Sequence, residues 1–480
     1  MSQPATIVWF RRDLRLHDNP AWNWAVEQGG PIVPVYLHCP TDEGAWRRGG
    51  ASTGWLHHAL EDLAAQLASS GHRLVLRQST DSHDALQKVI AETQAQSVCW
   101  NRCYEPTMVQ RDSMLKQALQ SVGIETQSFN GSLLLDPLTT RNKAGKPFQV
   151  FTPFWKHCRA IGVHPVETSP PPSARPTKSI TSDRLDNLKL LPTIPWDTTI
   201  QETWKPTRQG GLELLDLAVR KSQSYLDTRD TPATDGTSRL SAYLHFGQIS
   251  PREFFHHIWQ HASDQELADT GILRQLYWRE FSAHLLFHFP HSQDTALKPA
   301  YDHFPWAFNE TYLRAWQLGQ TGFPIVDAGM RQLWQTGWMH NRVRMIAGSF
   351  LVKHLLQPWQ EGARWFWDTL CDADLANNSI GWQWIAGSGA DASPYFRIFN
   401  PILQGQKFDP LGDYVHRWCP ELAQLPKKNI HTPWDAPPDV LQSAKIKLGH
   451  HYPHPITSHQ EGRNRALSAY THYKEISRQL

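Results

Sequence analysis

Five short apolar runs alternate with amphipathic stretches along the first 130 residues of the chain. The runs have the length of buried strands and lie at Ile7 to Phe10, Ile32 to Leu37, Leu74 to Leu76, Val98 to Trp100 and, as a weaker run, Ile124 to Phe129. Between them, apolar side chains recur at helical spacing, from Trp55 to Leu67 and from Leu115 to Val122. Strands that alternate with helices predict an α/β domain with a Rossmann-like parallel sheet.

The α/β region lacks the two common phosphate-binding loops. It contains neither a GxGxxG dinucleotide fingerprint nor a GxxxxGK[ST] loop. If this region binds a ligand, the expected place is the crevice at the carboxyl ends of its strands.

Beyond the predicted sheet the pattern changes twice. Residues 132–205 are rich in Pro, Ser and Thr and show little periodicity, so we interpret them as an interdomain connector. From residue 206 to Leu480 the apolar positions follow helical spacing with almost no alternation. The sequence therefore predicts an α/β domain at 1–131, a connector at 132–205 and an all-α domain at 206–480, without internal repeats.

Charge and cysteine content limit which ligands and which cellular compartment we expect for the protein. Lys and Arg number 47 against 45 Asp and Glu, a formal net charge of +2, so a polyanion would have to bind a local basic patch. The six cysteines are scattered, with no CxxC pair, and no apolar run approaches the roughly 20 residues that span a bilayer. We expect a reduced, cytoplasmic, monomeric protein with no membrane contact and no metal or iron–sulfur site.

The segment from Asp372 to Trp384 places three informative side chains at helical spacing. Asp374, Asn378 and Trp382 are four residues apart, so on a helix they share one face. Two hydrogen-bonding groups and an oxidisable indole on one face suit a planar heteroaromatic redox cofactor. A helix packed by its two tryptophans and capped by Asp372 fits the same spacing.

A second cluster lies in the turn from Asp235 to Ser241. Its hydroxyl groups and Arg239 precede a predicted helix at Ser241 to Phe246, and a helix start attracts phosphate oxygens through its unpaired N–H groups and its dipole. A plain helix cap explains the same residues. Two further segments combine aromatic, amide and charged side chains, at Gln275 to Phe281 and at Trp338 to Met345.

Together these motifs resemble, in order, those of the DNA photolyase and cryptochrome family, and most of all its cyclobutane-pyrimidine-dimer photolyases. The motifs are TIVWFRRDLRLHDNPA near the N-terminus, DGTSRLS, WREF, GWMHNRVRM, DADLANN followed by GWQW, and SPYFRIFNP with Gln404 and Lys407. The resemblance covers essentially the whole chain. It implies an α/β domain that can hold an antenna chromophore and a helical domain that holds FAD in a U-shape.

The resemblance also implies which residues hold FAD. Asp372 would pair with Arg344, Asp374 would accept a hydrogen bond from the flavin ring, and Asn378 would lie against flavin N5. A neutral amide there does not deliver a proton readily, which favours the fully reduced flavin anion that repair requires. The residues implied around the phosphates and the ribityl chain are Tyr225, Thr237, Ser238, Arg239, Leu240, Ser241 and Arg279.

Tryptophan is unusually frequent in the composition, and the resemblance implies a function for some of the tryptophan residues. The chain has 22 tryptophans, ten of them between Trp278 and Trp384, and most fit the core of a helical domain. Trp382, Trp359 and Trp306 match the family's chain of indoles, along which electrons pass between the flavin and the surface in short hops.

The same resemblance implies a lesion-binding surface. Trp278 and Trp384 match the pair that clamps a flipped-out dimer, whose poorly stacked bases are cheap to extrude. The contacts with the phosphates of the strand should make binding salt-dependent. The residues implied in the pocket are Gln275, Asn341, Met345 and Arg397, and those implied at the lesion strand are Arg229, Arg342 and Gln404.

Gln275 departs from the commonest bacterial photolyases, which carry Glu three residues before the Trp of WREF. The acid is thought to stabilise the radical anion of the dimer, so the amide puts the efficiency of repair in doubt. Gln275, the Leu-Arg-Gln run that it ends, and the run WNRCYEP at 100–106 are similar to the class III branch near plant cryptochromes. Six-four photolyases have a His-rich segment where this chain has only His340, which argues against that substrate.

We therefore expect a light-driven repair enzyme, a deoxyribodipyrimidine photo-lyase that uses reduced FAD and binds UV-damaged DNA. A cryptochrome photoreceptor without repair activity is the alternative, and Asn378 favours the enzyme because plant cryptochromes carry Asp there. A light-independent flavin electron carrier leaves the aromatic pair Trp278 and Trp384 unexplained. The class III resemblance favours methenyltetrahydrofolate as antenna over a deazaflavin.

Overall fold

A five-stranded parallel sheet forms the N-terminal part of the protein, as the apolar runs predict. The computed structural model describes residues 3–172 and 180–478. The strands pair in the order β3-β2-β1-β4-β5, which places the reversal of winding between β1 and β4. Their bounds are Thr6–Phe10 for β1, Ile32–His38 for β2, Val75–Gln78 for β3, Ser97–Asn101 for β4 and Glu125–Phe129 for β5.

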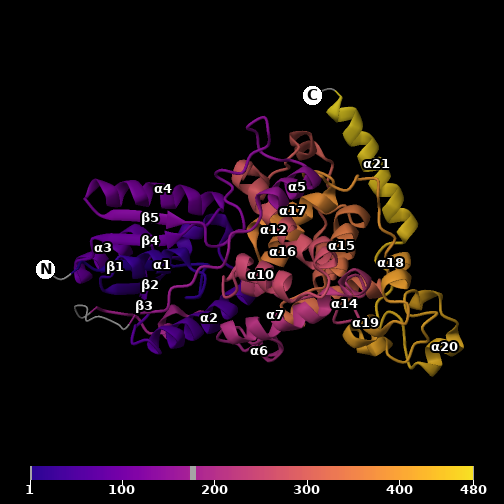
Figure 1. Ribbon diagram of the computed structural model, residues 1–480. Helices are drawn as coiled ribbons and strands as arrows, with labels where there is room; N and C mark the ends of the chain where they lie inside the picture. The colour runs from indigo at the N-terminus through magenta and orange to yellow at the C-terminus, as the bar shows by residue number, and fades with distance from the viewer. Residues whose placement is uncertain (1–2, 173–179, 479–480) are drawn as a thin grey trace. The chain divides into compact units, whose positions relative to one another are not determined.

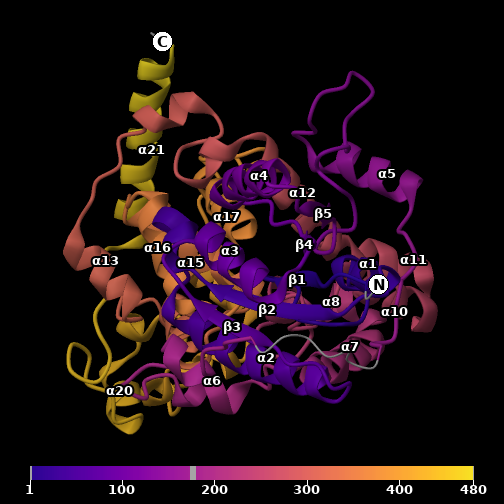
Figure 2. The same cartoon turned by 90° about the vertical axis from the view of Figure 1, so that its left-hand side faces the viewer.

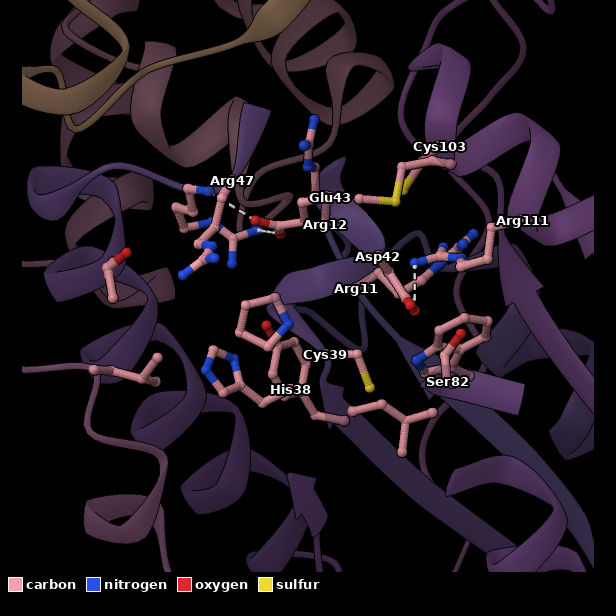
Figure 3. Close-up of a pocket in the computed structure, with 18 of the residues that line it drawn as sticks. Arg11, Arg12, His38, Cys39, Asp42, Glu43, Arg47, Ser82, Cys103 and Arg111 are labelled. Carbon is pink, nitrogen blue, oxygen red and sulfur yellow. Dashed lines mark hydrogen bonds and ion pairs between the residues drawn. The ribbon is translucent and has the colours of Figure 1, made fainter. Parts of the chain in front are cut away.

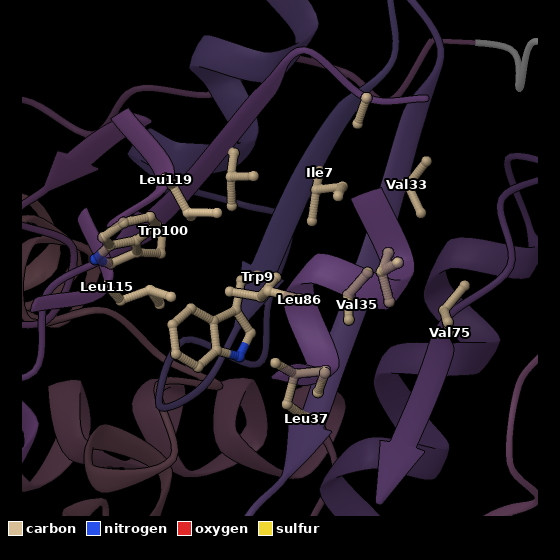
Figure 4. Close-up of a cluster of buried hydrophobic side chains, with 14 of the residues drawn as sticks. Ile7, Trp9, Val33, Val35, Leu37, Val75, Leu86, Trp100, Leu115 and Leu119 are labelled. Atoms are coloured by element: carbon tan, nitrogen blue, oxygen red, sulfur yellow. The ribbon is translucent and has the colours of Figure 1, made fainter. Parts of the chain in front are cut away.

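Helices cover both faces of this sheet (Figure 1, Figure 2). Alternate strand residues, such as Ile7 and Trp9, pack with Leu86 of one helix and Leu115 of another in a buried cluster (Figure 4). The opposite face holds Ala21, whose carbonyl lies 3.3 Å from the thiol of Cys99 on β4. The helices between the strands are α1 Pro20–Glu27, α2 Gly50–Ala68, α3 Ser82–Thr93 and α4 Pro106–Ser121.

The described chain forms two compact units that interleave in sequence. The first comprises the chain up to Gln223, Ser238–Pro290 and Cys371–Leu375, and the second comprises Ser224–Thr237, His291–Leu370 and the chain from Ala376. Beyond the sheet, the first unit contains α5 Phe151–Ile161, α6 Thr198–Thr203, α7 Arg208–Ser222, α9 Ser241–His245, α10 Pro251–His261, α11 Gln265–Ala268, a π-helical turn at Asp269–Leu273 and α12 Arg274–His288.

The second unit is helical. Among described residues after 206 there is no strand, only one isolated bridge between Leu448 and Tyr452, which confirms the predicted all-α region. No helix in the described part of the chain is long and apolar enough to cross a membrane. The α-helices of this unit are α8 Tyr225–Thr228, α13 Glu310–Gln317, α14 Pro324–Thr336, α15 Asn341–Ser349, α16 Trp359–Thr369, α17 Leu375–Ala386, which starts one residue before the unit, α18 Pro401–Phe408, α19 Asp413–Trp418, α20 Pro438–Ser443 and α21 His459–Ser477.

The segment 132–205 is less irregular than its composition suggests. Helix α5 lies inside it and buries Phe151, Phe154 and Cys158, which follow helical spacing. Part of the expected connector, residues 173–179, lies outside the described residues. The boundaries proposed at 131 and 205 stay a prediction.

The segment that follows β1 fastens the sheet to the helical part of its own unit. The Arg15 side chain is fully buried and donates to the carbonyl oxygens of Asp18, Gly131 and Gly247 at 2.6 to 2.8 Å. The Asp18 carboxylate, also buried, accepts hydrogen bonds from Ser250 and Arg252. Because buried charges are costly unless they are paired and hydrogen-bonded, this network specifies one arrangement of these loops.

Candidate functional site

The expected phosphate-binding turn has the predicted local form. Helix α9 begins at Ser241, and Arg239 just before it adopts a left-handed backbone conformation with φ of 55°. The hydroxyl of Ser238 accepts a hydrogen bond from the Leu240 amide at 3.4 Å, and that of Ser241 donates to the Asp372 carboxylate at 2.5 Å. The turn therefore brings hydroxyl groups and a guanidinium together with Asp372.

Arg279 is held in place from two sides within the first unit. Its guanidinium donates to the carbonyl oxygens of Ser132, at 2.9 Å, and of Leu244 in α9, at 3.4 Å. The neighbouring Glu280 is buried and accepts hydrogen bonds from the backbone amides of Leu134 and Leu135. Burial raises the pKa of Glu280 to about 7 against the opposing effect of Arg279 and those amides.

Asp374 lies beside a buried histidine. One of its carboxylate oxygens is 3.5 Å from Nδ1 of His245 in α9. Burial and then Arg12 lower the pKa of this imidazole, although Asp374 opposes them, so the ring is neutral at pH 7. A neutral ring whose Nδ1 carries the proton can donate to Asp374 and orient the carboxylate.

Of the three residues that the sequence predicts on one helical face, two lie in the same helix and the third precedes it. Helix α17 begins at Leu375, so Asp374 precedes it and only Asn378 and Trp382 share a helical face. The Asn378 amide donates to the carbonyl oxygen of Ala363 at 2.9 Å. This bond fixes the amide nitrogen and leaves the side-chain oxygen as the acceptor.

The proposed tryptophan chain runs from buried to accessible positions. Trp382 and Trp359 are each 2% exposed, whereas Trp306 is partly exposed. The indole of Trp382 packs against the backbone at Gly362, where a Cβ atom would come within 2.1 Å of the ring. Trp382 also contacts Phe366, with ring centroids 5.0 Å apart. Whether electrons pass along these three indoles stays a prediction.

The expected lesion-strand residues of the second unit include a clustered group. Arg342 pairs with Asp230 at 2.7 Å and lies over the ring of Phe408 at 4.4 Å. Arg229 lies over the ring of Tyr225 at 5.2 Å. Arg344 donates to the Met339 carbonyl at 2.8 Å; its expected pairing with Asp372 joins residues of different units and stays a prediction.

The remaining expected pocket residues of this unit are accessible to different degrees. Asn341 and Arg397 are exposed, and Met345, Trp384 and Gln404 are half-buried. Buried Lys353 donates to the carbonyl oxygen of Arg397 at 2.9 Å and so anchors the segment that carries this arginine.

Gln275 and Trp278 lie on one side of the first unit. Gln275 follows the π-helical turn, donates to the Gly271 carbonyl at 3.2 Å and is half-buried. Trp278, one turn further along α12, is also half-buried and stacks on Phe151 of α5, with ring centroids 3.6 Å apart. Insertions of this π type are frequent at functional sites.

The structure also contains a cavity at the carboxyl ends of the strands, the place expected for a ligand. Its volume is about 170 Å³, and it is bounded by the segments after β1 and β2, the loop after β4 and the starts of α2 and α3 (Figure 3). None of its residues was predicted from the sequence to contact a ligand. The available signal was the pair Arg11 and Arg12 directly after the first apolar run.

Paired arginines dominate this cavity. Arg11 pairs with Asp112 at 2.5 Å, Arg12 pairs with Glu105, and Arg48 pairs with Glu43. Burial alone would raise the pKa of Glu43, but Arg48 holds it below its ordinary value, so the carboxylate stays charged. The arginines that line the cavity are Arg11, Arg12, Arg47, Arg48 and Arg111. Arg111 also pairs with Asp112, at 2.7 Å, so at least four of the five guanidinium groups have a carboxylate partner. The lining still offers N–H donors, which suit a ligand that carries carboxylates.

The chain is similar to known proteins along nearly its whole length. Residues 6–173 match the family model described as DNA photolyase, and residues 272–472 match the FAD binding domain of DNA photolyase. A deoxyribodipyrimidine photo-lyase of Agrobacterium fabrum is 47% identical over 98% of each chain. Cryptochrome-1 of Arabidopsis thaliana is 39% identical over 97% of this chain and 70% of its own.

Among solved structures, a class III photolyase from Agrobacterium tumefaciens superposes with a TM-score of 0.95. It is 46% identical and covers 99% of this chain and 98% of its own. The similarity therefore extends across both compact units.

Proposed function

The chain belongs to the DNA photolyase and cryptochrome family, and on that premise we infer that it is a deoxyribodipyrimidine photo-lyase, which uses light to split cyclobutane pyrimidine dimers in DNA. The observation that carries this inference is the match to a photo-lyase over nearly all of both chains. A cryptochrome photoreceptor is less supported, because the cryptochrome matches, at 39% and 38% identity, are weaker than the match to the photo-lyase at 47%.

The donor groups that the family resemblance assigns to FAD have the chemistry that this cofactor requires. Ser238, Ser241 and Arg279 offer hydroxyl and guanidinium donors for phosphate oxygens. Asp374 offers a carboxylate for a ring N–H, and Asn378 offers an amide oxygen. When bound and fully reduced, FAD supplies the electron that splits the dimer.

The protein's own part in the reaction is to orient groups and withhold a proton. The Asn378 amide, fixed by the Ala363 carbonyl, has no acidic proton to give to flavin N5. Trp278 and Trp384 supply aromatic faces for the flipped bases, and Gln275 supplies hydrogen bonds to them. Trp382, Trp359 and Trp306 return electrons to the oxidised cofactor.

The arginine-lined cavity fits an antenna chromophore. Its guanidinium groups suit the carboxylates of methenyltetrahydrofolate, and a deazaflavin with an acidic side chain fits the same charges. The test is reconstitution of the purified protein with each compound, followed by absorption and energy-transfer measurements. Thr53→Trp, which fills the cavity from its wall, should abolish chromophore uptake, whereas Thr53→Ala should retain it.

The proposed activity is tested with purified, reduced protein and an oligonucleotide that contains one thymine dimer. Blue light should restore both thymines, and the same mixture kept in darkness should restore none. Protein that binds FAD and is photoreduced but restores no thymine under light would favour the photoreceptor alternative.

A further inference from the structure

Three aromatic rings of the first unit form a parallel column that ends at Trp278. Phe151 lies against Trp278 with ring centroids 3.6 Å apart and planes 5° from parallel, and Trp155 continues the stack beyond Phe151 at 6.4 Å and 6°. Phe151 and Trp155 are four residues apart on α5, so both project from one side of that helix toward α12.

The contact between Phe151 and Trp278 is not one that packing alone favours. Aromatic pairs prefer offset or edge-to-face arrangements with centroids about 4.5 to 7 Å apart, because the negative faces of two rings repel each other. Here the rings are nearly coaxial, so the column has to be stabilised by other groups.

Two side chains supply that stabilisation. The guanidinium of Arg274 lies over Trp155 at 4.6 Å and over Phe151 at 5.5 Å, so its positive charge offsets the repulsion between the ring faces. Phe281 makes edge-to-face contacts with two rings of the column, with Phe151 at 5.8 Å and 69° and with Trp278 at 6.1 Å and 73°. Arg274, Trp278 and Phe281 all belong to α12, so one helix holds both the platform and its supports.

The column fixes the orientation of a residue expected to meet the substrate. Phe151 occupies one face of the Trp278 indole, and Trp278 remains partly exposed. A base extruded from DNA can then stack on the opposite face without first ordering the indole. Such preorganisation raises affinity by lowering the entropy lost on binding.

We propose that Phe151 is a positioning residue for dimer recognition, which holds Trp278 as a rigid stacking platform with the help of Arg274. The proposal rests on the proposed function, because it takes a flipped-out dimer to be the ligand that stacks on Trp278. Phe151 itself touches no substrate.

The test compares Phe151→Leu, Phe151→Tyr and Phe154→Leu with wild type as FAD-loaded proteins. Phe154 lies on the same helix, is buried and contacts Phe281 at 5.3 Å and 46°, but it stands outside the column. Binding is measured with oligonucleotides that do and do not contain a thymine dimer, together with FAD content and photoreduction rate.

Phe151→Leu should weaken binding to dimer DNA about three- to tenfold while binding to undamaged DNA stays constant, which is the effect of freeing one large side chain. Phe151→Tyr keeps the ring and should restore wild-type discrimination. Phe154→Leu should lower thermal stability without altering discrimination. FAD content and photoreduction should match wild type in all three.

The possible results distinguish a failure of the proposed function from a failure of the positioning role of Phe151. Wild type that does not prefer dimer DNA would overturn the proposed function. If wild type prefers dimer DNA and Phe151→Leu prefers it equally well, the positioning role alone is overturned. The same holds if Phe154→Leu loses discrimination to the same degree as Phe151→Leu. If Phe151→Leu does not fold, the test depends on Phe151→Tyr. The positioning role is then overturned if Phe151→Tyr does not discriminate between the two DNAs as wild type does.

Discussion

Replacing Glu280 by Gln should stabilise the protein above neutral pH and leave it nearly unchanged in acid. One oxygen of this carboxyl accepts two backbone N–H groups, while Oε1 is buried without a hydrogen-bond partner. Gln has the shape of the protonated acid and keeps an oxygen for the two amides, so the substitution removes the titration together with the ion pair between Oε1 and Arg279 at 3.6 Å.

The size of the effect follows from the raised pKa of Glu280. Burial moves it from 4.5 to about 7, so between these pH values the folded protein binds more protons than the unfolded chain. The free energy of unfolding of wild type therefore falls as pH rises through this window, and the full cost persists above pH 7. A shift of that size corresponds to about 3 kcal/mol at 1.36 kcal/mol per pH unit.

The assay is urea denaturation of wild type and Glu280→Gln at pH 5 and at pH 8. Because a chain with two compact units need not unfold in two states, the measured quantity is the difference between the two proteins at each pH. That difference should grow by about 2.5 kcal/mol from the lower to the upper pH, because pH 5 already lies above the unfolded pKa of 4.5 and part of the cost is present there. Glu213→Gln, at a half-exposed carboxylate, is the control and should show no such growth. Equal differences at both pH values would refute the reasoning, because Glu280 would then ionise as readily in the folded as in the unfolded chain.

Substitutions at three further positions test the proposed flavin and lesion chemistry. Trp382→Phe should abolish photoreduction of oxidised flavin but leave repair by chemically reduced enzyme nearly intact; loss of both would contradict a role confined to refilling the cofactor. Asn378→Asp places an acid where the amide stood and should raise the share of protonated flavin radical in absorption spectra under light, so identical spectra would show that residue 378 does not face N5. Gln275→Ala should weaken dimer binding by roughly 1–3 kcal/mol for each polar group of the dimer left unpaired, whereas Gln275→Glu should change affinity little and repair per photon more. Unchanged binding and repair in Gln275→Ala would place this residue outside the lesion pocket.

The sequence predicted the sheet well because parallel strands are buried on both faces. The central strands read as continuous apolar runs for this reason, whereas the edge strand β5 is only partly buried and its run is weaker. Each predicted run overlaps an observed strand to within a few residues. Helix α5 was missed since Pro153 lies in its first turn and the surrounding composition resembles a connector. Helix spacing also grouped Asp374 with Asn378, but spacing alone does not reveal where a helix begins.

The candidate site depended more on motif resemblance than on local pattern. Nothing local to Asp374 predicts His245 as its neighbour, because the two are far apart in sequence and meet only through tertiary packing. Phe151 and Trp278 were likewise separate motifs until the structure stacked them. The arginine-lined cavity was predicted as a location, since parallel strands end at a common edge, but its arginines were not identified.

The interleaving of the two units constrains how the protein can be made. Five residues, Cys371–Leu375, complete the first unit although two segments of the second unit precede them in sequence, and Asp372 among them bonds to Ser241. The first unit therefore cannot finish folding on the ribosome until translation has passed residue 375. A fragment that stops at Pro290 contains the whole sheet yet lacks this closing segment, so we expect it to expose apolar surface and to require a chaperone that the full chain escapes.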